Sequence, residues 1–236
     1  MKNYFKKLQE DVRFQEGLNA CINCGTCTAI CPAAEFYRYD PRQIADVVQS
    51  RNDDEIETLL KSDTIWYCGE CMSCKTRCPR GNAPGLIIIA LRSLSQDTGL
   101  FIHSEKGRQQ LAVKRTVGEN ILKTGYCVYP GSLIPSLHPE QGPVWEWELE
   151  NIDHVMHKLG ANYNGEGAGA LRKIPEESLK ELKAIFDETG ATDRWELIEK
   201  ISAEKANDMG LTFDETMNCS YFKYIYKHNS RNHFAE

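Results

Sequence analysis

Residues 21–32 read CINCGTCTAICP and residues 68–79 read CGECMSCKTRCP. Both have the spacing C-x2-C-x2-C-x3-C-P, so the cysteine pattern is an internal repeat. Three thiolates spaced three residues apart on a tight loop can each bind one iron of a cubane cluster. The fourth cysteine is carried away by the turn before proline, and in two-cluster ferredoxins it binds the other cluster. The runs therefore predict two [4Fe–4S] clusters with crossed ligand sets: Cys21, Cys24, Cys27 and Cys78 for one, and Cys68, Cys71, Cys74 and Cys31 for the other.

Two other uses of the cysteines are open at this point, a zinc site and a set of free thiols. Zinc also accepts four thiolates, but its sites usually combine two separated C-x2-C pairs rather than four cysteines in one run. Disulfides are typical of small secreted chains, whereas eight of the ten cysteines here are bunched into two runs. Iron–sulfur binding is the reading that this spacing favours.

Charge and hydropathy exclude several classes of protein. The chain has 28 basic and 34 acidic residues, a net charge of −6, which argues against a nucleic-acid partner. The apolar stretch at 84–91 meets Arg92 far short of the roughly 20 residues that a membrane span requires. The first seven residues are charged and do not resemble a secretory signal. We expect a cytoplasmic protein without a membrane span, whose contact with a membrane would be peripheral, through a complex.

The segments around the cysteine runs have helical patterns. Asp40 followed by Pro41 predicts an N-cap and the first position of a helix with Ile44, Val47 and Val48 on one face. Asp53 or Asp54 is expected to cap a second helix, with Ile56, Leu59 and Leu60 on one face. Pro84 is expected to start a third helix that ends near Gly99 and buries a stripe of Leu86, Ile89, Ala90 and Leu94. These patterns predict an all-α domain.

The remainder of the chain is expected to be a helical extension. Prolines and glycines indicate an irregular segment at 126–143, and 146–159 has a helical pattern. Residues 165–169 read GEGAG and suggest a flexible hinge. A helix is expected from Pro175 to Gly190, a further one capped by Thr192, and the aromatic stretch 220–226 is expected to pack on the body or on a partner. We therefore predict two domains, 1–125 and 126–236, the second serving partner contact.

Positive charge is concentrated in the second run. Lys75, Arg77 and Arg80 lie in or directly after it, whereas only neutral residues separate the cysteines of the first. Because positive charge stabilises the reduced, more anionic cluster, we expect the cluster bound mainly by the second run to have the higher potential, although Glu70 opposes this.

Other candidate groups have weaker signals. Cys127 and Cys219 lie outside the runs and could form a redox pair or bind a third centre, although such cysteines are more often small buried residues. His154 and His157 are three apart on an expected helix, but no further metal ligand accompanies them. The 165–169 stretch lacks the G-x-G-x-x-G spacing. No residue is predicted to be catalytic.

Several short motifs narrow the family. The spacer of about 36 residues between the runs, Asp40-Pro41-Arg42, residues 62–68 (SDTIWYC) and residues 78–81 (CPRG) resemble the C-type subunit of heterodisulfide reductase over roughly residues 15–100. The resemblance implies an alpha-helical ferredoxin domain that passes electrons between a flavin-bearing A-type subunit, which is a flavoprotein, and a catalytic B-type subunit. Motifs of the B type contain a Cys-Cys pair, and this chain has no adjacent cysteines. The long region after Tyr126 resembles the heterodisulfide reductase-like complexes of sulfur-oxidising bacteria, which implies a sulfur compound on a lipoyl or related thiol as substrate.

Two other functions remain as alternatives. One is an iron–sulfur subunit that feeds electrons to a membrane quinone site. Subunits of the succinate dehydrogenase type have an additional N-terminal [2Fe–2S] domain, and the 20 residues before Cys21 are too few for one, so the glycerol-3-phosphate dehydrogenase type fits better. The other is a redox sensor or an assembly scaffold, for which an exposed, labile cluster is typical.

Overall fold

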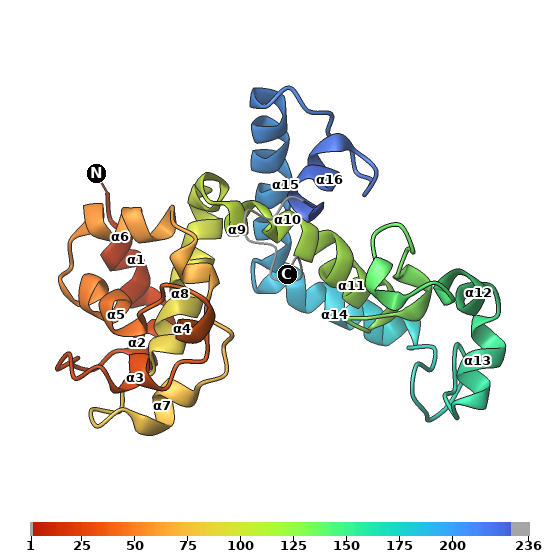
Figure 1. Ribbon diagram of the computed structural model, residues 1–236, viewed down its shortest axis with the longest axis horizontal. Coiled ribbons are helices and arrows are strands. Elements are labelled where there is room, and N and C mark those ends of the chain that lie inside the picture. Colours follow the sequence, from red (N-terminus) through yellow and green to blue (C-terminus); the bar gives the residue numbers. More distant parts are fainter. Residues whose placement is uncertain (1, 228–236) are drawn as a thin grey trace. The chain divides into compact units, whose positions relative to one another are not determined.

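The computed structural model describes residues 2–227, and every regular element among them is helical, in agreement with the predicted all-α class (Figure 1). The chain forms two compact units. The first combines the residues up to Gln110 with those from Glu196 onward, and the second is Leu111–Trp195. None of the described helices is both long enough and apolar enough to cross a membrane.

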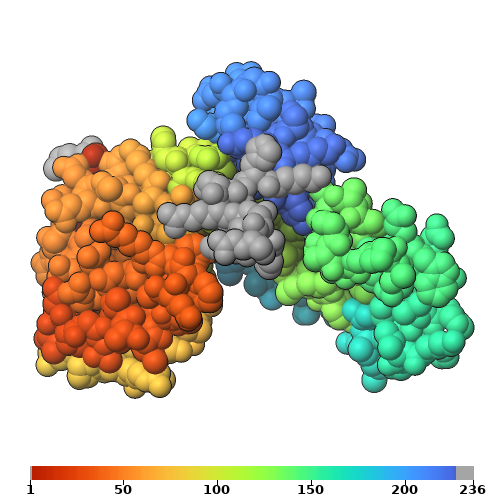
Figure 2. Space-filling view, viewed as in Figure 1, coloured from red at the N-terminus to blue at the C-terminus, as the bar shows by residue number. Residues whose placement is uncertain are grey.

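The first unit contains both cysteine runs. Figure 2 shows its N-terminal part, coloured red to yellow, as one continuous body. Its helices up to residue 108 are α1 (Tyr4–Glu10), α2 (Val12–Gly17), α3 (Thr26–Ala29), α4 (Ala33–Phe36), α5 (Pro41–Gln49), α6 (Asp53–Leu60), α7 (Ser73–Arg77), α8 (Pro84–Asp97) and α9 (Glu105–Arg108), with 3-10 turns at Thr64–Trp66 and Leu100–His103.

Helix α8 is the centre of this unit, and α1, α2, α5 and α6 all pack against it. Its buried face consists of Ile87, Ile88, Ala90, Leu91 and Leu94, each at most 7% exposed. The predicted stripe is therefore half wrong: Ala90 and Leu94 are buried, but Leu86 and Ile89 are only partly so. The closest approach is at Gly17 of α2, where an added Cβ would lie 3.0 Å from Ile87 Cγ1 and 3.2 Å from the Ala83 carbonyl oxygen.

Helix caps agree with the sequence at one position and differ at another. Asp40 caps α5 as predicted, and its carboxylate accepts hydrogen bonds from the backbone N–H groups of Arg42 and Gln43 at 2.9 and 3.3 Å. In α6 the cap is Asn52, not Asp53 or Asp54; both aspartates lie in the first turn, where negative charge also stabilises a helix.

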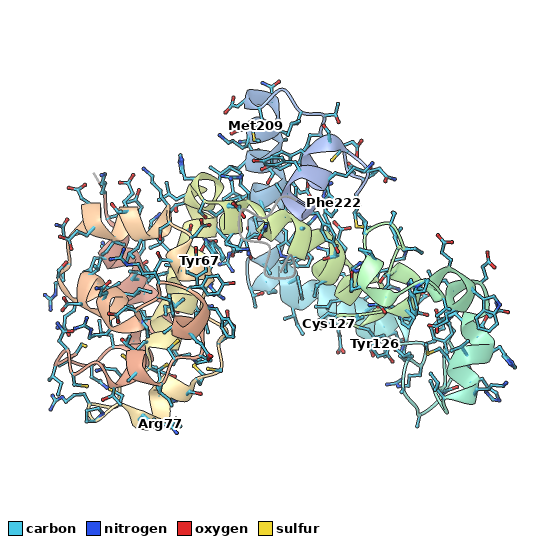
Figure 3. All side chains as sticks on the ribbon, in the orientation of Figure 1. Tyr67, Arg77, Tyr126, Cys127, Met209 and Phe222 are labelled. Carbon is cyan, nitrogen blue, oxygen red and sulfur yellow. The ribbon has the colours of Figure 1, made fainter. Side chains whose placement is uncertain are left out.

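The chain from Glu196 onward completes the first unit and contains most of one helix and all of another. Helix α15 (Ala191–Asp208) starts before Thr192, so Thr192 is inside the helix and not its cap. Helix α16 (Ser220–Lys227) buries Tyr221, Phe222 and Ile225 to 2% exposure or less. Phe222 is labelled on this helix in Figure 3. The aromatic stretch thus packs on the body of the protein, one of the two outcomes expected for it.

The second unit begins within α10 (Gln110–Val113) and ends within α15. Between them lie a π-helical turn at Lys114–Gly118, α11 (Glu119–Thr124), 3-10 turns at Pro130–Ser132 and Pro139–Gln141, α12 (Trp145–Glu150), α13 (Ile152–Lys158) and α14 (Glu176–Glu188). The helix expected at 146–159 is thus broken at Asn151. The 165–169 stretch is a closed loop rather than a free hinge, because Asn162 Nδ2 donates to the carbonyls of Glu166 and Ala168 at 2.9 and 3.1 Å.

Candidate metal centres

Two hollows in the first unit are lined by cysteines. Hollow A is lined by Cys21, Cys24, Cys27 and Cys78. Hollow B is lined by Cys31, Cys68, Cys71 and Cys74. Each has a volume of about 380 Å³, including the open space at its mouth. The fourth cysteine of each run thus lies with the first three of the other run, which is the grouping that the spacing predicts for the ligands.

The loops that carry the first three cysteines of each run have the same backbone. Asn23 and Glu70 occupy equivalent positions and have φ of 61° and 54°. Gly25 and Met72 are also equivalent, with φ of 80° and 56°. Left-handed backbone is unfavourable for residues other than glycine, so Met72 is held in a conformation that Gly25 adopts freely. The repeat of the sequence is therefore a repeat of the chain path.

This path directs polar hydrogens toward the thiols. The backbone N–H of Asn23 donates to Cys21 Sγ and that of Glu70 to Cys68 Sγ, both at 3.4 Å. Hydrogen bonds to cluster ligands stabilise the negative charge that a thiolate-bound cluster carries.

The outer thiols of the two loops make matching contacts. Cys24 Sγ lies 3.4 Å from the Thr26 hydroxyl and Cys71 Sγ lies 3.5 Å from the Ser73 hydroxyl. These contacts lower the pKa of Cys24 and of Cys71, both of which are exposed.

Three other thiols, those of Cys27, Cys31 and Cys74, are half-buried and not exposed. Burial raises the pKa of Cys27, Cys31 and Cys74, so these thiols hold their protons more tightly than free cysteine does. A metal must displace those protons to bind, which makes metal binding and proton release one event.

The helix that follows each run fixes the first cysteine of that run. Gln49 of α5 accepts from Cys21 N at 2.7 Å and donates to Cys21 O at 3.2 Å. Arg92 of α8 donates to Cys68 O at 2.6 Å and to Ile65 O at 2.7 Å. Neither Gln49 nor Arg92 is among the site residues predicted from the sequence. The signal was available, because Gln49 is eight residues after Pro41 and Arg92 is eight residues after Pro84.

Besides its sulfurs, the side-chain polar groups that line hollow B are the hydroxyls of Ser73 and Tyr39. Besides the cysteines it is lined mainly by Ala33, Tyr39, Pro41, Met72, Gly85 and Ile88. The Tyr39 ring packs edge-on against Tyr67, which directly precedes Cys68. The Tyr39 hydroxyl is buried and has no hydrogen-bond partner at normal distance. Burial and the neighbouring Cys68 sulfur raise the pKa of Tyr39, so this hydroxyl remains a donor.

The lining of hollow A includes Arg42, Arg80 and Asn82 in addition to its cysteines. Asn82 Oδ1 accepts from Asn19 N at 2.6 Å and Asn82 Nδ2 donates to Ala20 O at 3.4 Å, which ties the segment before Cys21 to the segment after Cys78.

The cations of the second run do not gather at the hollow to which that run contributes three cysteines. Of the three expected there, Arg80 lines hollow A, while Lys75 and Arg77 are exposed and line neither hollow (Figure 3). Arg80 therefore lies at the other hollow from the one that the sequence predicted.

The remaining candidates do not assemble into sites. His154 and His157 are exposed on α13, and among residues 2–227 no three histidine, cysteine or acidic side chains converge on a point that would suit a single metal ion. Cys127 is exposed, whereas Cys219 is 4% exposed with its sulfur 3.6 Å from the Thr216 carbonyl oxygen. The description of a small buried residue fits Cys219 but not Cys127.

The residues around both hollows fit a [4Fe–4S] cluster. Each hollow offers four soft thiol donors around a central space, which suits iron–sulfur clusters. Backbone N–H groups already point at a ligand sulfur in each set. In hollow B, the unpaired Tyr39 hydroxyl supplies a further donor beside Cys68.

Comparison with known proteins supports iron–sulfur binding by this part of the chain. A family described as the 4Fe–4S dicluster domain matches residues 17–82, which decides against the zinc alternative. The chain is 33% identical to the C subunit of the ferredoxin:CoB–CoM heterodisulfide reductase of Methanosarcina acetivorans over 200 residues, covering 85% of this chain and 73% of that protein. The corresponding protein of Methanosarcina mazei is 33% identical over 73% of this chain and 88% of its own length.

A third relative is the second iron–sulfur C subunit of the CoB–CoM heterodisulfide reductase of Methanocaldococcus jannaschii, 31% identical over 63% of this chain and 74% of its own length. The 200-residue match extends well past residue 125. The length of the region after Tyr126 therefore does not separate this chain from the CoB–CoM heterodisulfide reductases. The chain belongs to the family of heterodisulfide reductase C subunits and is an iron–sulfur electron-transfer protein that binds two [4Fe–4S] clusters.

Proposed function

We propose that hollows A and B each hold one [4Fe–4S] cluster on the four cysteines that line it. We propose further that the chain relays electrons between a flavoprotein of the A type and a catalytic protein of the B type. Both would belong to a heterodisulfide reductase-like complex that acts on a disulfide or another sulfur substrate. The observation that carries the proposal is the exchange of Cys31 and Cys78 between the two cysteine runs.

The arrangement suits a relay because both clusters would lie in one rigid unit. When bound, the clusters supply one-electron transfer without any change at a substrate. The protein holds the two sets together by the shared runs and by contact of α3 with α7, the short helices that follow the loops. Loss of a crossed cysteine is therefore expected to disturb the packing of both runs.

Both hollows have an edge that a partner could reach. Cys24 of hollow A and Cys71 of hollow B are exposed, and Ile22 beside Cys21 is 58% exposed. The relatives are named as subunits of enzymes that act on the CoB–CoM heterodisulfide. A relay of one-electron centres can deliver, one at a time, the two electrons that reduction of a disulfide consumes, so the proposed substrate class is compatible with this chain.

The ligand sets are tested by substituting the two crossed cysteines. Anaerobically purified protein is expected to contain about eight irons and eight sulfides per chain. Cys31→Ser is expected to alter the electron paramagnetic resonance signal that Cys71→Ser also alters, and Cys78→Ser the signal that Cys24→Ser alters. Cys127→Ser is the matched control and is expected to change neither signal. If Cys31→Ser and Cys24→Ser alter the same signal, the ligands are not crossed and the proposed sets are wrong.

The partners are tested by purifying the complex from native cells under anaerobic conditions. Recovery of a flavoprotein together with a protein that contains Cys-Cys motifs supports the proposed relay. Recovery of a membrane anchor with a quinone-linked dehydrogenase would establish the glycerol-3-phosphate dehydrogenase type instead. Recovery of a transcriptional regulator or of an apo-protein acceptor would establish the sensor or scaffold.

A further inference from the structure

The two hollows are built by equivalent segments, so their linings can be compared position by position. Each run is followed by a helix that starts with proline, α5 at Pro41 and α8 at Pro84. Pro41 lines hollow B while the next residue, Arg42, lines hollow A. Pro84 lines hollow A while the next residue, Gly85, lines hollow B. At these positions, a residue of the first repeat that lines one hollow has its equivalent in the second repeat at the other hollow.

This comparison reveals a difference in charge. The residue two positions after the fourth cysteine of each run lines a hollow: Ala33, after Cys31, lines hollow B, and Arg80, after Cys78, lines hollow A. At the position after the helix proline, hollow A has Arg42 where hollow B has Gly85. Both differences place a cation at hollow A and a small uncharged residue at hollow B.

Carboxylates offset two of the nearby cations. Arg42 pairs with Asp40 at 2.9 Å, and Arg92, which contacts the Cys68 carbonyl beside hollow B, pairs with Glu70 at 2.5 Å. These two ion pairs are balanced between the hollows. Among the described residues no ion pair includes Arg80, so of the two cations that line hollow A it is the one that no carboxylate offsets.

We propose that the centre in hollow A has the higher reduction potential and that Arg80 is the residue that sets this order. The proposal rests on the ligand sets proposed above. Reduction adds one negative charge to a cluster, and a nearby cation stabilises that charge while an apolar lining does not. When the protein carries a single electron, that electron therefore resides mainly on the centre in hollow A, and the centre in hollow B stays oxidised.

Two features limit the size of the effect. Arg80 is exposed, so water screens its charge, and exposed charge pairs are typically worth about fivefold or less in an equilibrium. The Tyr39 hydroxyl beside Cys68 acts in the opposite direction, because a hydrogen-bond donor also stabilises a reduced centre. The apolar side chains of Met72 and Ile88 offset that donor in hollow B, whereas their equivalents in hollow A are Gly25 and Ala45.

The test is a potentiometric titration of the holoprotein with dithionite as reductant, followed by electron paramagnetic resonance. The signals are first assigned with Cys24→Ser for hollow A and Cys71→Ser for hollow B. In the wild type the signal of hollow A is expected to develop at the higher potential. Arg80→Ala and Arg80→Gln are expected to lower the midpoint of that signal and to shift the sharing of one electron toward hollow B by about fivefold.

Arg77→Ala is the matched control, since Arg77 is an exposed arginine three residues away that lines neither hollow. It is expected to leave both midpoints unchanged. Ala33→Arg, which introduces the cation at the equivalent position of hollow B, is expected to raise the midpoint of the other signal. The proposal is overturned if hollow B is reduced first, if Arg80→Ala leaves the hollow A midpoint unchanged, or if Arg77→Ala lowers it equally.

Failure of this proposal is distinguishable from failure of the ligand assignment. If the protein lacks about eight irons, or if Cys24→Ser and Cys71→Ser alter the same signal, the proposed centres themselves are wrong. If the protein has two separately assigned centres but Arg80 variants do not move the midpoint of hollow A, only the role of Arg80 is wrong.

Discussion

Gln49→Ala is predicted to loosen the first cysteine of hollow A without touching any cysteine side chain. Gln49 holds the backbone of Cys21 by two hydrogen bonds, accepting from its N–H at 2.7 Å and donating to its C=O at 3.2 Å. These bonds tie the start of the cysteine loop to the end of α5. Alanine keeps α5 intact, because it is the residue with the highest helix propensity.

The magnitude follows from these two bonds. Each hydrogen bond contributes about 0.5–1.5 kcal/mol net, so the loss of both would cost about 1–3 kcal/mol. Cys21 is only partly buried, and water can replace part of what is lost, so we expect the free energy of unfolding to fall by about 1–2 kcal/mol. That is roughly a 5- to 30-fold change in the ratio of folded to unfolded protein.

The assay is urea unfolding of the holoprotein under anaerobic conditions, followed by helical circular dichroism and by the visible absorption of the clusters. Gln43→Ala is the matched control, a glutamine on the same helix whose backbone N–H, and not its side chain, contacts Asp40. Gln49→Ala should also release iron from hollow A before hollow B. The reasoning is refuted if the two variants have the same stability, or if the signal of hollow B is the first to disappear.

Three further predictions address other parts of the structure. Arg92→Lys should destabilise the first unit by about 2–3 kcal/mol although it keeps the charge. The planar guanidinium of Arg92 bonds the carbonyls of Ile65 and Cys68 and the carboxylate of Glu70 at the same time, and the ammonium of lysine does not have that geometry. Equal stability of the variant and the wild type in urea unfolding would contradict this. Burial raises the pKa of Asp11, but hydrogen bonds from Arg13 outweigh burial and hold that pKa below its usual value. The pair therefore stabilises the folded protein above about pH 4, and this contribution is lost as the pH falls through the folded-state pKa of Asp11. Asp11→Asn should therefore cost about 0.5–1 kcal/mol at pH 7, and the difference from wild type should shrink in unfolding measured below about pH 4. Gly118→Ala should destabilise the second unit by about 1–3 kcal/mol, because the added Cβ would lie 2.6 Å from the Trp195 ring; near-ultraviolet circular dichroism identical to wild type during thermal unfolding would argue otherwise.

The sequence predicted the elements whose boundaries are marked by distinctive residues. Asp40 and Pro41 fix the start of α5, because an aspartate cap followed by proline has few other uses. The start of α6 is ambiguous in the sequence, because Asn52, Asp53 and Asp54 can all cap a helix. Only the path of the preceding chain selects Asn52. The residues at 52–54 do not by themselves determine the backbone path that precedes them.

Helix α8 shows a different limit. Leu86, Ile87, Ile88, Ile89 and Leu91 make nearly every face of its first turns apolar, so periodicity cannot fix which face is buried. The packing of Gly17 against Ile87 and Ala83 selects the face, and that contact joins segments about 70 residues apart. The loop at 165–169 was misjudged for a similar reason, since the side chain of Asn162 that closes it lies outside the glycine-rich stretch.

Arg80 lies at a different hollow from the one expected, because the position of a residue within a run does not decide which hollow it lines. If a fourth cysteine crosses to the other hollow, the residues that follow it cross as well. Arg80 comes two residues after Cys78, and Cys78 lines hollow A, so Arg80 also belongs to hollow A. Ala33 follows Cys31 into hollow B in the same way. Crossed ligand sets would thus exchange the electrostatic environments of the two runs. With the ligand sets proposed above, the residues after the fourth cysteine of one run would tune the centre that holds the first three cysteines of the other.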